Sequence, residues 1–155
     1  MAGVIRDRDY LKEFFSDPQN DAGCRAIALL EMDHFQKAHV ELGMAGIQRM
    51  MTRMGEELLE VADDGTEIIR YDDMTYVVIL HHLSGQDEIW DRCVTLHQAV
   101  KLTTIRGITF TVSLGAAECL SGDKGCQIAL DQALKALGEA QTVGDRVVLH
   151  SNSKE

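Results

Sequence analysis

Four acidic residues lie where two buried strands are expected to end. Glu31 and Asp33 stand at the end of an apolar run, and Asp72 and Asp73 follow a second short strand. Carboxylate oxygens are preferred ligands of Mg²⁺, Ca²⁺ and Mn²⁺, so these acids could hold a divalent cation if the two strand ends are neighbours. The plainer interpretation, which we prefer, is a solvated acidic patch.

The cysteines and histidines do not predict a further metal site. The four cysteines lack the spacing of a zinc knuckle and are interpreted as buried thiols of a cytoplasmic protein: Cys24, Cys93, Cys119 and Cys126. The adjacent residues His81 and His82 follow an apolar strand, so their side chains should face opposite ways. We interpret both as residues of the surface or the core edge, and not as ligands.

The composition predicts an ordinary globular domain. Of 155 residues, 45% are hydrophobic and one is proline, which favours a single domain over residues 1–150 followed by a polar tail, 151–155. The formal net charge of −10 disfavours binding to nucleic acid and to anionic membranes. No apolar run approaches the roughly 20 residues that a membrane span needs.

The hydrophobic pattern alternates between strand and helix periods. Helices are expected at 9–15, 45–62, 87–102 and 126–141, and strands at 24–32, 67–70, 76–80, 109–117 and 144–150. Residues 71–75 form a polar hairpin tip, and a loop with the only proline covers 16–23. The order predicts an α+β fold with a ferredoxin-like βαββαβ core, an added helix and strand, and a mostly antiparallel central sheet flanked by helices.

Five segments, in order and spacing, resemble the GGDEF family of diguanylate cyclases. They cover almost the whole chain: 2–5 (AGVI), 29–35 (LLEMDHF), 70–78 (RY, a hairpin, then YVV), 111–116 (TVSLGA) and 140–144 (AQ, then G). The resemblance implies a palm-like fold. It also implies the family's reaction, in which two domains of a dimer join two GTP molecules into cyclic di-GMP with the help of divalent cations.

The metal-binding positions that the resemblance implies are only partly kept. Glu31 falls on the first metal carboxylate, Met32 would offer its backbone carbonyl, and Asp33 keeps a second acid. Asp73 completes the set of candidate metal ligands. Glutamate at position 31 conserves the charge of the family's acid, but its side chain is longer.

The signature hairpin departs further from the family. Asp72 and Asp73 replace two glycines, Met74 replaces a metal-binding acid, Thr75 replaces the following glutamate, and Tyr76 stands for phenylalanine. A thioether is a poor ligand for Mg²⁺. Two carboxylates at the glycine positions would also repel a triphosphate.

The nucleotide-binding positions have changed as well. His39 and Gln48 stand at the base-reading positions, and Gln141 replaces a triphosphate-binding lysine. Arg70 is the one triphosphate residue that survives, although a salt bridge to Glu31 or Asp73 would also explain it. The product-inhibition segment, 63–66 (DDGT), lacks its arginine.

These substitutions predict a degenerate GGDEF domain with no catalytic residues and no required cofactor. We expect a protein-interaction or regulatory module of bacterial cyclic di-GMP signalling, whose partner is a protein with a basic patch and which does not bind cyclic di-GMP. Two alternatives stay open: a sensor of GTP or a divalent cation (Mg²⁺ or Ca²⁺), and a residual cyclase. Trp90 is expected to be a core or interface anchor.

Overall fold

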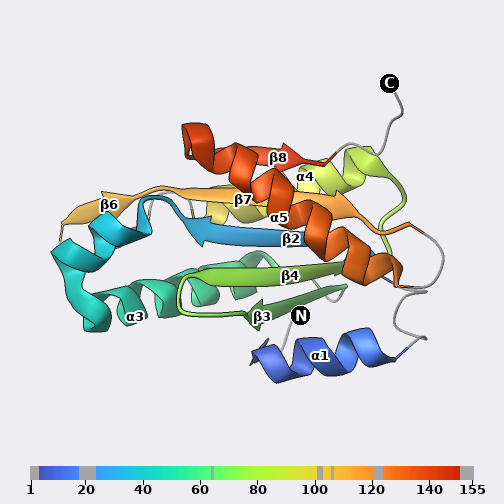
Figure 1. Ribbon diagram of the computed structural model, residues 1–155, viewed down its shortest axis with the longest axis horizontal. Helices are drawn as coiled ribbons and strands as arrows, with labels where there is room; N and C mark the ends of the chain where they lie inside the picture. The colour runs from blue at the N-terminus through green and yellow to red at the C-terminus, as the bar shows by residue number, and fades with distance from the viewer. Residues whose placement is uncertain are drawn as a thin grey trace.

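A central sheet of six strands organises the molecule (Figure 1). The computed structural model describes residues 4–17, 24–63, 65–100, 103–105, 107–120 and 124–150. The sheet order is β1 (Ile5–Arg6), β3 (Thr66–Arg70), β4 (Thr75–His81), β2 (Cys24–Met32), β7 (Val112–Glu118) and β8 (Val147–Leu149).

The predicted βαββαβ core is confirmed. It runs from β2 through α3 (Phe35–Val61) to the β3–β4 hairpin, and then through α4 (Gln86–Val100) to β7. Its neighbouring strands are antiparallel, whereas the two edge strands β1 and β8 pair in parallel with β3 and β7. This is the α+β, mostly antiparallel arrangement that the sequence predicted.

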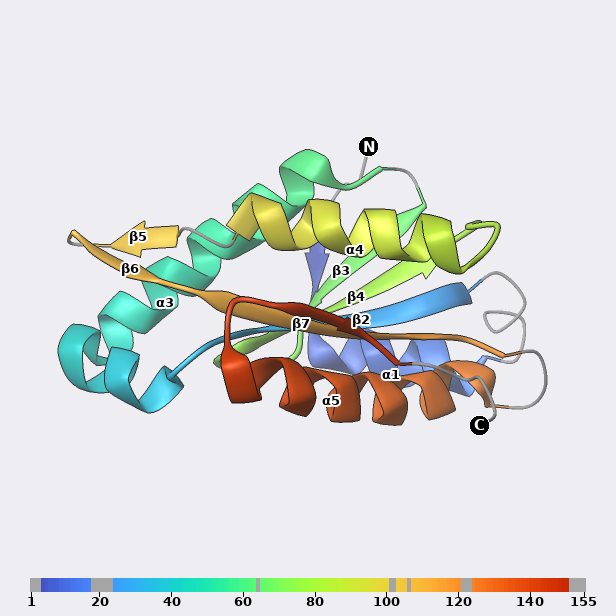
Figure 2. The same cartoon turned by 90° about the horizontal axis from the view of Figure 1, so that it is seen from above.

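Helices cover both faces of the sheet, as Figure 2 shows. α3 and α4 lie on one face, and α1 (Arg8–Ser16) lies with α5 (Gly125–Val143) on the other. Side chains of a strand alternate between the faces. In β4, Tyr76 and Val78 therefore pack against the α3 and α4 side, while Val77 and Ile79 pack toward α1 and α5.

Helix α5 approaches β7 at a glycine. A Cβ atom built on Gly115 would lie 2.1 Å from the backbone nitrogen of Leu137 and 2.6 Å from the carbonyl oxygen of Ala133. No side chain fits in that space, so the glycine sets the distance between the helix and the sheet.

Several predicted bounds are corrected. The second helix begins at Phe35 and not near residue 45, because two helical segments meet at a kink where Gly43 has φ 70°. The strand expected over 109–117 is divided into β6 (Ile108–Phe110) and β7, and β6 pairs with an unpredicted strand, β5 (Thr103–Ile105). Strand β1 was not predicted either.

Other expectations concern single residues. Met50, Met51 and Met54 of α3 are buried, whereas Trp90 is 42% exposed and is therefore not a core residue. Residues 2–3 of the expected opening turn, 18–23 of the proline loop and the tail 151–155 lie outside the described residues. Within the described part of the chain, no helix has the length and apolar character needed to cross a membrane.

Candidate functional site

The hairpin between β3 and β4 is closed by its own polar groups. The backbone N–H of Tyr71 donates to the carbonyl of Thr75 at 2.9 Å. The N–H of Met74 donates to the Asp72 carboxylate, also at 2.9 Å. Aspartate commonly stabilises a turn in this way. Asp72 thus has a local structural role at a position where the family has glycine.

Arg70 holds the same hairpin from its base. Its Nε donates to the carbonyl of Asp72 at 2.9 Å, and its terminal nitrogen lies 3.5 Å from both the Asp73 carbonyl and Oε1 of Gln48. Arg70 thus contacts backbone carbonyls and Gln48, in place of the salt bridge to Glu31 or Asp73 that was one explanation for it. The surviving arginine therefore stabilises the backbone of the turn.

Glu31 lies beside the hairpin, opposite Thr75 in the register of β2 and β4. The side chains of Gln141 and Thr75 face its carboxyl group as potential hydrogen-bond donors. Burial raises the pKa of Glu31 above its ordinary value, and the neighbouring charge of Asp72 adds to this rise. The residues that replace the family's lysine and glutamate thus solvate this acid as neutral donors.

Asp33 is a buried anchor and not an open ligand. Its side chain is 3% exposed. Oδ1 accepts from Ser113 Oγ at 2.7 Å, and Oδ2 accepts from Thr111 Oγ1 at 2.6 Å and from the backbone N–H of Asp145 at 2.8 Å. The carboxylate therefore joins the end of β2 to β7 and to the turn after α5.

The arrangement does not fit a centre of two divalent cations. Asp33 directs both oxygens at protein donors, and Met74 offers only a thioether at the hairpin. Within the described ranges, no three acid, histidine or cysteine side chains are grouped so that they could hold a metal ion. Asp72 and Asp33 are charged neighbours of Glu31, although these acids do not form such a group, and Met32 is buried in the core.

A hollow of about 600 Å³ lies between the hairpin and the first turns of α3. Its lining combines apolar side chains with the two hairpin acids: Phe35, Gln36, His39, Val40, Met44, Asp72, Asp73 and Met74. His39 thus lies in this hollow, while Gln48 contacts Arg70 and Gln141 contacts Glu31. Of the candidate nucleotide-binding residues, the structure thus brings Gln48 and Arg70 into contact, whereas His39 and Gln141 make contacts elsewhere.

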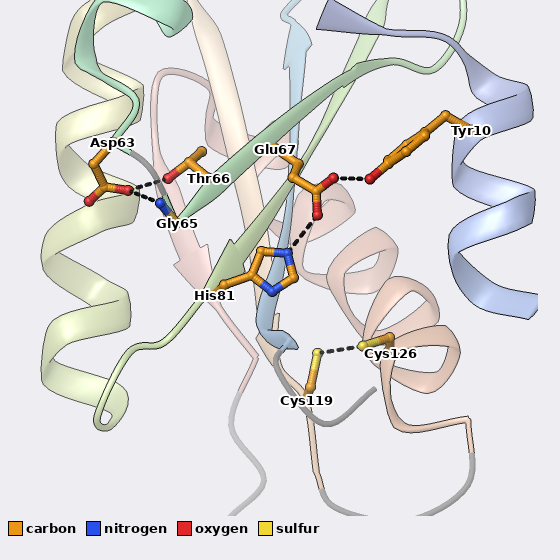
Figure 3. A network of polar contacts seen from close by, with 8 residues as sticks. All are labelled: Tyr10, Asp63, Gly65, Thr66, Glu67, His81, Cys119 and Cys126. Carbon is orange, nitrogen blue, oxygen red and sulfur yellow. Dashed lines mark hydrogen bonds and ion pairs between the residues drawn. The ribbon is translucent and has the colours of Figure 1, made fainter. Parts of the chain in front are cut away.

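Asp63, Gly65 and Thr66 of the product-inhibition segment are joined by hydrogen bonds. Asp63 Oδ1 accepts from the N–H of Gly65 at 3.0 Å and from Thr66 Oγ1 at 2.9 Å, as Figure 3 shows. Arg92 approaches the other oxygen of Asp63 at 3.6 Å. Asp63 therefore stabilises the entry to β3.

A polar network that the sequence did not predict connects α1 to the sheet (Figure 3). The hydroxyl of Tyr10 donates to one oxygen of Glu67, and the other oxygen lies 2.6 Å from Nε2 of His81. Burial, together with the bond to Glu67, raises the pKa of Tyr10 to about 12. The hydrogen bond from His81 lowers the pKa of Glu67. Only the placement of His81 at the core edge could be expected from its position after a strand.

The family and its solved structures agree with this fold. The model for "Diguanylate cyclase, GGDEF domain" matches residues 5–146. The active GGEEF domain of a diguanylate cyclase from Vibrio cholerae is 12% identical with a TM-score of 0.80, covering 97% of this chain and 100% of that one. The FimX GGDEF domain from Pseudomonas aeruginosa is 14% identical with a TM-score of 0.77, covering 92% and 93%.

A third similar structure includes a protein partner. Diguanylate cyclase SiaD from Pseudomonas aeruginosa, solved in complex with its activator SiaC, is 18% identical with a TM-score of 0.79. The match covers 94% of this chain and 58% of SiaD. Among curated proteins, none matches the sequence. The family match extends over most of the chain, and the protein belongs to the GGDEF family.

Proposed function

We propose that this chain is a GGDEF domain that makes no cyclic di-GMP and that acts in cyclic di-GMP signalling through contacts with another protein. The observation that carries the proposal is the condition of two acids, Glu31 at the end of β2 and Asp33 directly after it. Glu31 faces the side-chain donors of Gln141 and Thr75, and Asp33 is buried among three donors. Neither carboxylate is left to organise the cations on which the family's reaction depends.

The hairpin supports the same proposal. Met74 lines the hollow where a metal-binding acid is expected from the family's signature. Arg70, the surviving triphosphate residue, is already engaged by the carbonyls of Asp72 and Asp73. Loss of either a metal ligand or a positioned cation typically costs orders of magnitude in rate.

Chromatography of a reaction with GTP tests the loss of activity. The chain is incubated with GTP and Mg²⁺ or Mn²⁺, beside an active GGDEF domain and a blank without protein. We expect no cyclic di-GMP above the blank. Product that appears with the wild type and disappears with Glu31→Ala would show a working cyclase and refute the proposal.

The proposed contact surface is the acidic hairpin with the hollow beside it. Asp72 and Asp73 stand at the rim, and apolar side chains such as Val40, which is 83% exposed, lie next to them. A basic side chain beside an apolar one would fit this surface. The net charge of −10 would steer such a partner toward the domain.

A pull-down with charge-reversal variants tests the surface. Wild type is compared with Asp72→Lys/Asp73→Lys, and with the control Glu60→Lys/Asp91→Lys, which makes the same change of charge at exposed positions of α3 and α4. We expect the hairpin variant alone to lose the partner. An unchanged set of captured proteins would exclude the hairpin as the contact. Calorimetry that finds tight binding of GTP or a cation instead would favour the sensor alternative.

A further inference from the structure

The end of β7 and the start of α5 bring two thiols together (Figure 3). Cys119 directly follows β7, and Cys126 is the second residue of α5. The Cys119 thiol donates to the sulfur of Cys126 at 3.5 Å, and the two side chains point toward one another. Two cysteines seven positions apart are thus placed side by side by the tertiary structure.

Close packing of the backbone fixes this arrangement. A Cβ atom on Gly125 would lie 2.1 Å from the carbonyl oxygen of Leu120, so the residues that neighbour the two cysteines are in contact. Both thiols belong to the apolar cluster between the sheet and α5. Cys119 keeps 8% of its surface exposed, whereas Cys126 has none. An oxidant would therefore reach Cys119 first.

We propose that Cys119 and Cys126 form a redox-sensitive pair, which a peroxide oxidises to a disulfide and a thiol reductant restores. The thiolate of Cys119 attacks one oxygen of hydrogen peroxide, the O–O bond breaks, and hydroxide leaves, which gives a sulfenic acid. The thiolate of Cys126 then attacks that sulfur, the S–O bond breaks, and the second oxygen leaves as hydroxide. With the two thiol protons, both hydroxides become water.

The geometry demands little movement for the second step. The sulfur atoms must approach from 3.5 Å to the roughly 2.05 Å of a disulfide. Cys126 lies in the first turn of α5, where the helix dipole favours an anionic sulfur. Reversible disulfides in reducing compartments are typical of redox-responsive sites.

Cys93 provides an internal control. It is fully buried in the cluster on the opposite face of the sheet, and burial raises the pKa of its thiol to about 12. A thiol with so high a pKa is a poor nucleophile at neutral pH, and the sheet separates Cys93 from the Cys119 and Cys126 pair. Cys93 should therefore stay reduced under conditions that oxidise Cys119.

Peptide mapping of the wild-type chain tests the pair directly. The folded protein is treated with hydrogen peroxide, alkylated, and cleaved with trypsin after lysine and arginine. Cleavage at Lys124 separates Cys119, in peptide 107–124, from Cys126, in peptide 125–135. We expect these two peptides to be linked, with a mass about 2 Da below their sum, and dithiothreitol to separate them.

Two variants locate the bond, with circular dichroism to check that each is folded. Cys119→Ser should abolish the link, and Cys93→Ser should retain it. The proposal is wrong if both peptides of the wild type are recovered alkylated, if Cys119 ends as a sulfinic acid without a link, or if the link joins Cys93 or Cys24. The wild-type map decides the question even if a variant fails to fold.

Discussion

Asp33 shows how one side chain, at a position where the family has a metal-binding acid, stabilises the fold. Its carboxylate receives hydrogen bonds from Thr111, Ser113 and the backbone of Asp145, and so ties three segments together. Buried hydrogen bonds to a charged group contribute more than neutral ones. An acid at this position is therefore explained without any cation.

Replacement of Asp33 should consequently destabilise the protein. Asp33→Ala leaves the buried hydroxyl of Ser113 and two further donors without an acceptor. We expect the free energy of unfolding to fall by about 3 kcal/mol. Urea denaturation measures the change, with Asp73→Ala, an exposed hairpin acid, as the control that should stay near the wild type. Equal stability of both variants would contradict the anchoring role.

Tyr10 should make stability depend on alkaline pH. Its pKa is raised from 10.0 to about 12 in the folded chain, so the neutral hydroxyl is favoured by folding. This stabilisation is complete below pH 10 and is lost as the pH rises toward 12. Tyr10→Phe should lower the free energy of unfolding at neutral pH by about 1 kcal/mol.

The difference between wild type and Tyr10→Phe should then shrink between pH 10 and 12. Chemical denaturation at a series of pH values measures it. Tyr71→Phe is the control, because the Tyr71 hydroxyl accepts from Arg8 at 3.1 Å and does not contact a carboxylate. If the difference in unfolding free energy stayed constant across this pH range, ionisation of the Tyr10 hydroxyl would not weaken its interaction with Glu67, and the prediction would be wrong.

The sequence indicated the candidate residues of the site but not what each one contacts. The hairpin and Arg70 were located by their spacing. The presence of Met74 in place of the family's metal-binding acid could be seen directly in the sequence. The burial of Asp33 depends on donors nearly 80 positions away and on the turn after α5. Such long-range partners are not encoded in local patterns, and the Tyr10, Glu67 and His81 network escaped notice for the same reason.

At the level of elements, continuous apolar segments were the most predictable. The bounds expected for β2 are those of the structure, because residues 26–30 form the continuous apolar run that is typical of a central strand with both faces covered. The first turns of α3 were missed because Gly43 interrupts the helical period with φ 70°. The two-residue strand β1 is too short to produce any pattern.

The packing of α5 on β7 gives an element-scale prediction. A methyl group at position 115 would meet the backbone of Leu137 and Ala133, which cannot rotate away as a side chain can. Gly115→Ala should therefore cost about 3 kcal/mol of unfolding free energy. Thermal denaturation measures it against Gly138→Ala in α5, where nothing lies within 4 Å of the added methyl group. The control should be neutral or slightly stabilising.

At the level of the whole molecule, the charge distribution opposes anionic ligands. The net charge is −10. In the segment that would bind product, the Asp63 carboxylate accepts hydrogen bonds from Gly65 and Thr66. We expect cyclic di-GMP to bind with a Kd weaker than roughly 100 μM, equivalent to about 5.5 kcal/mol. Isothermal titration calorimetry measures this, and micromolar binding would contradict it.

Both margins of the sheet are occupied by very short strands. β1 has two residues and β8 has three, so each offers few backbone groups to an incoming extended segment. Exposed long edges are the usual starting point of intermolecular sheet growth and of amyloid-like association. This protein is thereby protected against aggregation through its sheet. A partner that adds a β-strand to either margin would also gain little, which favours the proposed contact through the hairpin.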